Sequence, residues 1–74
     1  MNGGTVSQWE LIRLFHVTGT AWNVTAYGSD GVESHDVQSI GDTIVELLNQ
    51  GWEFASASWA GPDHEVLYFK RPVT

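Results

Sequence analysis

Histidine, serine and carboxylate side chains adjoin one another at two places in the sequence. Residues 34–36 are serine, histidine and aspartate, and His64 lies between Asp63 and Glu65. The first set has the residue types of a nucleophilic triad, and the second has side chains that bind metal ions. Consecutive side chains of an extended chain diverge, and no G-x-S-x-G elbow, H-x-H or H-E-x-x-H spacing occurs. We therefore expect no catalytic residue, no metal site and no cofactor.

His16 shares a strand face with the apolar residues Ile12 and Leu14, so we expect it to be partly buried. Such a histidine either is hydrogen-bonded at a strand end or makes association depend on pH. An enzyme that uses His16 or His64 at a subunit interface is the remaining catalytic hypothesis, but no recognisable set of partners accompanies either histidine. The sequence therefore favours a protein that is not an enzyme.

Arg13 stands on a strand face that it shares with aromatic residues, Trp9 and Phe15. In such surroundings a guanidinium group is expected to stack on a ring or to pair with a carboxylate such as Glu53 or Glu65. We interpret Arg13 as a structural or interface residue.

Length and charge restrict what these residues can belong to. The chain has 74 residues, no cysteine and a net charge of −6. It is therefore one domain, 1–74, of marginal stability, for which oligomerisation is the expected reinforcement. Phosphate backbones and anionic membranes repel such a chain, so we expect neither nucleic acid nor membrane as a partner. Residues 1–7 resemble no signal peptide and are predicted to be a flexible tail of a cytoplasmic protein.

Four strands are expected from the apolar patterns. Residues 8–17 are apolar on both faces, and residues 20–27 are β-branched and aromatic, so the two should form a hairpin about Thr18-Gly19. Residues 52–60 and 64–71 form a second predicted hairpin about the turn at residues 61–63. Residues 28–38 are polar, with two glycines, and are predicted to be a connector loop.

One helix is expected between the hairpins. Apolar residues recur at helical spacing in Ile40, Ile44, Leu47 and Leu48. Ser39 suits the N-cap, Asp42 suits the first turn, and Gly51 suits the left-handed position after the C-cap.

These elements predict an α+β domain, in the order β-β-α-β-β, with a four-stranded, mainly antiparallel sheet and the helix on one face. Two strand orders stay open: 2-1-3-4, which connection rules favour, and 2-1-4-3, which puts the two most apolar strands in the centre. In either order one helix covers only one face of the sheet.

Three stretches resemble a family of short bacterial domains, the domain of unknown function family 4177. They are the WE-L-I pattern at residues 9–12, LLNQGWEFASAS at 47–58 and LYFKRP at 67–72. Residues 17–36 do not match, and Gln50-Gly51 stands where the family has a few more residues. The resemblance implies a small antiparallel sheet with one helix, and it implies no activity.

The uncovered sheet face suggests two functions. The first is a protein-interaction module that self-associates or docks on a larger protein. Its expected surface residues are Trp22, Trp59, Arg13, His16 and Tyr68. The alternative is a module that binds a small ligand in an apolar pocket, at the sheet face or in a dimer groove. Its expected lining is Trp52, Ser56, Ser58 and Trp59.

Overall fold

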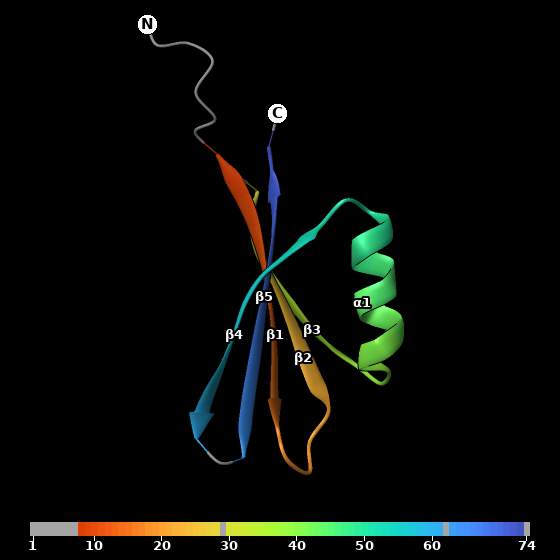
Figure 1. Cartoon of the computed structure of the whole chain (residues 1–74), viewed down its shortest axis with the longest axis vertical. Helices are drawn as coiled ribbons and strands as arrows, with labels where there is room; N and C mark the ends of the chain where they lie inside the picture. The colour runs from red at the N-terminus through yellow and green to blue at the C-terminus, as the bar shows by residue number, and fades with distance from the viewer. Residues whose placement is uncertain (1–7, 29, 62, 74) are drawn as a thin grey trace, which may run out of the picture.

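The computed structural model describes residues 8–28, 30–61 and 63–73, apart from the side chains at 59 and 60. They form one five-stranded sheet with a helix on one side of it (Figure 1). The elements are β1 (Trp9–Val17), β2 (Trp22–Gly28), β3 (Gly31–Val37), α1 (Ile40–Asn49), β4 (Glu53–Gly61) and β5 (His64–Pro72). The strand order is β3-β2-β1-β5-β4, and every neighbouring pair is antiparallel.

The α+β class, the antiparallel sheet and the helix are confirmed, but the four-stranded β-β-α-β-β arrangement is wrong. Most of the segment expected to be a connector loop, 28–38, is strand β3, which pairs with β2 from Gly28↔Gly31 to Trp22↔Val37. Residues 31–36 are exposed at this edge of the sheet. Because an edge strand with two solvated faces needs no apolar alternation, the sequence carried no hydrophobic signal for it.

The observed order decides between the two arrangements that the sequence left open. β1 and β5, the two most apolar strands, pair along their whole length, from Trp9↔Pro72 to Val17↔His64. This is the 2-1-4-3 arrangement, extended at one edge by β3. Burial of the most apolar strands therefore outweighs the preference for pairing strands that are joined through the helix.

The helix begins and ends as the sequence predicts. The Ser39 side chain accepts a hydrogen bond from the backbone N–H of Asp42 at 3.2 Å, which caps the N-terminus. Gln50 is the C-cap, and Gly51 follows with φ of +89°, a conformation that glycine adopts without the steric cost of a Cβ.

Replacement by alanine should stabilise the fold at Gly41 and destabilise it at Gly51. A Cβ on Gly41, in the first turn of α1, meets no atom within 4 Å, so Gly41→Ala should raise the free energy of unfolding by about 0.5 kcal/mol. A Cβ on Gly51 also has room, but its left-handed backbone should make Gly51→Ala cost about 1 kcal/mol. Urea unfolding of the two variants measures both effects, and equal signs would contradict the assignment of the helix end.

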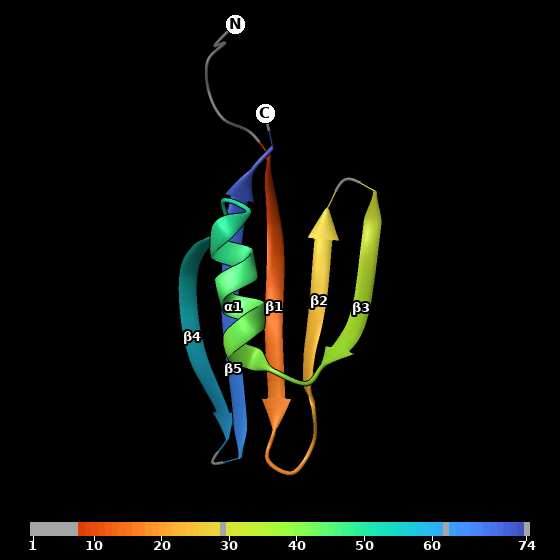
Figure 2. The same cartoon turned by 90° about the vertical axis from the view of Figure 1, so that its right-hand side faces the viewer.

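The hydrophobic core lies between α1 and the sheet. Its buried members are Ile12, Leu14, Val24, Leu47, Trp52 and Phe69. Figure 2 shows α1 in front of β1 and β5, with the β2–β3 hairpin extending beside it. Because side chains alternate along a strand, the even-numbered residues of β1 face the helix and the odd-numbered ones face the other side. We call the sheet surface opposite α1 the open face.

Candidate interaction surface

The open face carries an apolar stripe along its two central strands. The pairing registers Leu11↔Lys70, Arg13↔Tyr68 and Phe15↔Val66 fix which side chains share this face. The apolar stripe consists of Trp9, Leu11, Phe15, Val17, Val66 and Tyr68, with Tyr27 of β2 beside Leu11. None of the described residues forms a helix or strand over it (Figure 1). The apolar stripe is therefore the candidate interaction surface.

Trp9 is the most exposed member of the apolar stripe, with 49% of its surface accessible. The ammonium group of Lys70 lies 4.8 Å from the centre of its ring. Most of the other stripe residues are half-buried, because neighbouring side chains on the sheet shield one another, and Val66 is buried. Removing Trp9 therefore changes the surface more than it changes the packing of the monomer.

Arg13 lies within this aromatic surface, as the sequence predicts for a guanidinium that contacts a ring. Its guanidinium carbon is 5.6 Å from the centre of the Phe15 ring. Its Nε is buried, and no acceptor for it lies among the described residues. The ion pairs of the described residues join Arg71 to Glu10 and His16 to Glu65, so neither involves Arg13. A buried donor without an acceptor is unfavourable by about 1–3 kcal/mol. Arg13 itself lies on the open face.

The β2–β3 side of the open face carries a satisfied polar network at one end, and the apolar residues Tyr27 and Val32 lie at the other. Asn23 donates to the Ser34 hydroxyl at 2.9 Å and to the Asp36 carboxylate at 3.2 Å. Thr25, which is buried, donates to the Asn23 side chain at 2.7 Å. These polar groups are therefore satisfied within the sheet, and they can lie at the rim of a contact that is centred on β1 and β5.

Formal charge is distributed unevenly between the two sides of the sheet. The charged side chains of the open face are Arg13, Lys70, Asp36 and Glu53. Their charges cancel, so the helix side and the turns carry the net charge of −6. The helix side repels another copy of itself, and the open face does not.

His16 and Trp22, both predicted at the interaction surface, lie on the helix side of the sheet. Trp22 packs against the core, and its ring is stacked on the imidazole of His16 at 4.7 Å between centres. His16 Nδ1 is 3.5 Å from a Glu65 carboxylate oxygen. The structure therefore places Tyr68 and Arg13 on the open face and these two residues elsewhere. The side chain of Trp59 is outside the described residues.

The residues expected to line a ligand pocket do not come together. Trp52 is buried beneath the helix end, whereas Ser56 and Ser58 oppose Tyr68 and Val66 on the open face. Trp59, the fourth expected member, contributes no described side chain.

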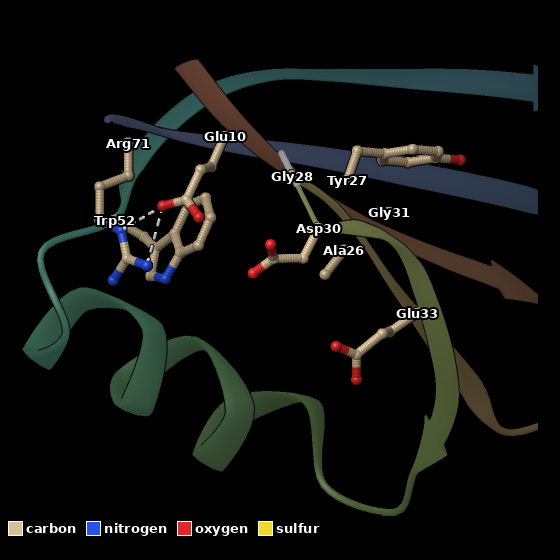
Figure 3. A pocket seen from close by; sticks show the side chains of 9 residues that line it. All are labelled: Glu10, Ala26, Tyr27, Gly28, Asp30, Gly31, Glu33, Trp52 and Arg71. Atoms are coloured by element: carbon tan, nitrogen blue, oxygen red, sulfur yellow. Dashed lines mark hydrogen bonds and ion pairs between the residues drawn. The ribbon is translucent and has the colours of Figure 1, made fainter. Parts of the chain in front are cut away.

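A different cleft lies at the helix side, between the β2–β3 turn and the end of α1 (Figure 3). It has a volume of about 220 Å³, and Asp30 and Glu33 extend into it. Arg71, at its other end, donates to Glu10 at 3.0 and 3.1 Å and lies 4.3 Å from the centre of the Trp52 ring. The Arg71 guanidinium, the basic group of the cleft, is therefore already paired with Glu10. The volume of the cleft is below that of common ligand sites.

The two sets that combine histidine with serine or carboxylate residues, 34–36 and 63–65, form no catalytic or metal-binding group among the described residues. Ser34 and Asp36 face the open side of β3 and His35 faces the other, as expected for consecutive strand residues. No three histidine, aspartate or glutamate side chains among the described residues are grouped to hold a metal ion.

Comparison with protein-family models, curated protein sequences and solved structures gives no match. The resemblance to family 4177 therefore stays a prediction. Within the described residues, the helical segment is too short and too polar to cross a bilayer.

Sequence reasoning missed several residues of this surface. The sequence pointed to Glu53 as a possible carboxylate partner of Arg13, but Trp9 and Lys70 were not among the residues expected at the surface. Their common face depends on the β1–β5 and β4–β5 registers. A usable signal existed in β2, where Trp22, Val24 and Ala26 alternate with Asn23, Thr25 and Tyr27. This alternation assigns Trp22 to the core side.

Proposed function

We propose that the chain is a non-enzymatic interaction module that forms a dimer with a second copy of itself through the open face. The observation that carries this proposal is the apolar stripe on β1 and β5, opposite the helix, on the side of the sheet that has no net charge. A two-fold dimer places the same surface of both copies in contact, so a surface without net charge is the one that can meet itself.

The size of the open face supports a dimer. Five strands span about 24 Å across, and nine residues span about 30 Å along a strand, which gives a projected area of about 700 Å². A stable interface of standard size takes about 800 Å² from each partner. The open face is therefore of the right order for a dimer when most of it is covered.

The sheet edges are less suited to association than the face. β3 exposes charged and polar side chains along one edge. On the other edge, β4 has register shifts between Phe54 and Ser56 and between Trp59 and Gly61. Charges and bulges are features that oppose the addition of another strand. Face-to-face packing is therefore the mode that we propose.

We place this module in the cytoplasm, with protein as its partner. A chain without cysteine needs no oxidising compartment, and a net charge of −6 opposes nucleic acid as a ligand.

The proposal predicts a concentration-dependent dimer that open-face substitutions weaken. Light scattering after size exclusion, over a dilution series, should give a dimer mass for the wild type. Trp9→Ser and Tyr68→Ser should each raise the dissociation constant at least about tenfold, because Trp and Tyr are enriched among interface residues whose loss costs about 2 kcal/mol or more, and about 1.4 kcal/mol is a factor of ten.

Phe54→Ser is the matched control, because Phe54 is an exposed aromatic residue, 55% accessible, on the helix side of the sheet. It should leave the dissociation constant unchanged. A wild type that stays monomeric at the highest concentration reached would exclude self-association. A dimer that Phe54→Ser disrupts and Trp9→Ser does not would assign the interface to the other side.

A further inference from the structure

Dimerisation through the open face would cover Arg13, whose side chain is only partly buried in the monomer. A charge that is buried without a counter-charge opposes association by several kcal/mol. Arg13 has no carboxylate partner among the described residues, and its Nε has no acceptor there. A stable dimer through this face therefore requires a carboxylate from the second copy.

Two carboxylates lie on the open face, and they differ in availability. Asp36 already accepts a hydrogen bond from Asn23 within the polar network. Glu53 is exposed on β4 and appears in no hydrogen bond or ion pair of the described side chains. Its cross-strand neighbour Lys70 lies over the Trp9 ring instead. Glu53 is therefore the carboxylate that is available to a partner.

We propose that each Arg13 in the dimer pairs with Glu53 of the second copy, so that two equivalent ion pairs flank the apolar stripe. This inference rests on the proposed dimer. It adds the groups that fix how the two copies are oriented, because a guanidinium and a carboxylate bind in a directed, two-bond geometry.

The strand order makes this pairing compatible with a two-fold axis. Arg13 on β1 and Glu53 on β4 are separated by β5, so they lie about 10 Å apart across the sheet. Along the strands they are offset by two residues, because Arg13 opposes Tyr68 and Glu53 opposes Lys70. A two-fold axis that lies between the two stacked sheets, parallel to their planes, and crosses β5 midway between Arg13 and Glu53 brings each residue over the position of the other. Each Arg13 then meets Glu53 of the second copy while the apolar stripes overlap at the centre.

Charge exchange tests the pair directly. In Arg13→Glu, both contacts of the homodimer join two carboxylates, and in Glu53→Arg both join two guanidinium groups. Each variant alone should dimerise at least about 100-fold more weakly than the wild type, because two contacts become repulsive at once. In an equimolar mixture every contact again joins opposite charges. The mixture should therefore form a heterodimer with a dissociation constant within about tenfold of the wild type.

Light scattering and native mass spectrometry of each variant and of the mixture measure these outcomes. Circular dichroism establishes that the variants are folded, and the double variant Arg13→Glu/Glu53→Arg should regain the homodimer. Glu46→Arg, which makes the same charge change on the exposed surface of α1, should not restore binding when mixed with Arg13→Glu. A monomeric wild type would overturn the dimer itself. A dimeric wild type whose single variants fail to recover in the mixture would overturn only the Arg13–Glu53 pair.

Discussion

Leu14→Ala should lower the free energy of unfolding by about 3 kcal/mol, because it truncates a fully buried core side chain. Leu14 is fully buried, with no accessible surface, and it opposes Val24 on one side and Leu67 on the other. Alanine at this position leaves a cavity in the only core that the described residues form. A domain of this length has a total stability of about 4–11 kcal/mol, so the loss is a large fraction of it.

Urea unfolding followed by tryptophan fluorescence, at a concentration that keeps each variant monomeric, measures this loss. The melting temperature should fall by about 15 °C, since 1 kcal/mol corresponds to 4–8 °C in a domain of this size. Leu48→Ala is the matched control, because it removes the same atoms from a leucine that is 53% exposed on α1. Its effect should stay below about 1 kcal/mol. Equal effects of the two substitutions would contradict the core described above.

The helix and the apolar strands were predictable because local chemistry and tertiary packing agree there. Ser39, Asp42 and Gly51 mark the ends of α1, and each satisfies a backbone requirement that exists before any packing. The strands at 8–17, 20–27 and 64–71 carry enough β-branched and aromatic residues to be recognised alone.

Strand β3 could not be predicted in the same way, because its stability comes from its neighbour. Val24↔His35 and Ala26↔Glu33 are backbone pairs in which the β3 side chain is exposed. What holds β3 is the ladder to β2 and the hydrogen bonds of Asn23 with Ser34 and Asp36, which join residues 11 and 13 positions apart. Nothing in the local sequence distinguishes such a strand from a solvated loop.

The sequence predicted that one face of the sheet is open, but it did not predict all the residues of that face. One helix cannot cover both faces of the sheet, so an open face follows from the element count alone. Which side chains point to it depends on pairing register, and β1 is apolar on both faces, so its sequence does not assign them. The expected surface set accordingly included Trp22, which packs against the core, and omitted Trp9, which lies on the open face.

Removal of the Arg71 guanidinium should also lower the stability of the fold. Its Nη1 donates to the carbonyl of Gln50 at 3.0 Å, at the C-terminal end of α1, and its Nε and Nη2 both donate to Glu10. The group also lies over the Trp52 ring at 4.3 Å. Arg71 therefore joins the helix end, β1 and β5 through one planar cation. Arg71→Leu should cost about 2–3 kcal/mol, since it also leaves Glu10 half-buried without its partner.

Two further variants separate the charge of Arg71 from its geometry. Arg71→Lys keeps the charge but cannot reach the Gln50 carbonyl and Glu10 together, so it should recover less than half of the loss. Lys70→Leu removes a positive charge from the adjacent residue, whose ammonium contacts only the exposed Trp9 ring among the interactions described, and should cost less than about 1 kcal/mol. Urea unfolding under monomeric conditions compares the three variants. If Arg71→Leu and Lys70→Leu prove equally mild, the linkage between α1, β1 and β5 does not stabilise the fold, and the packing of Trp52 and Leu47 alone holds the helix end against the sheet.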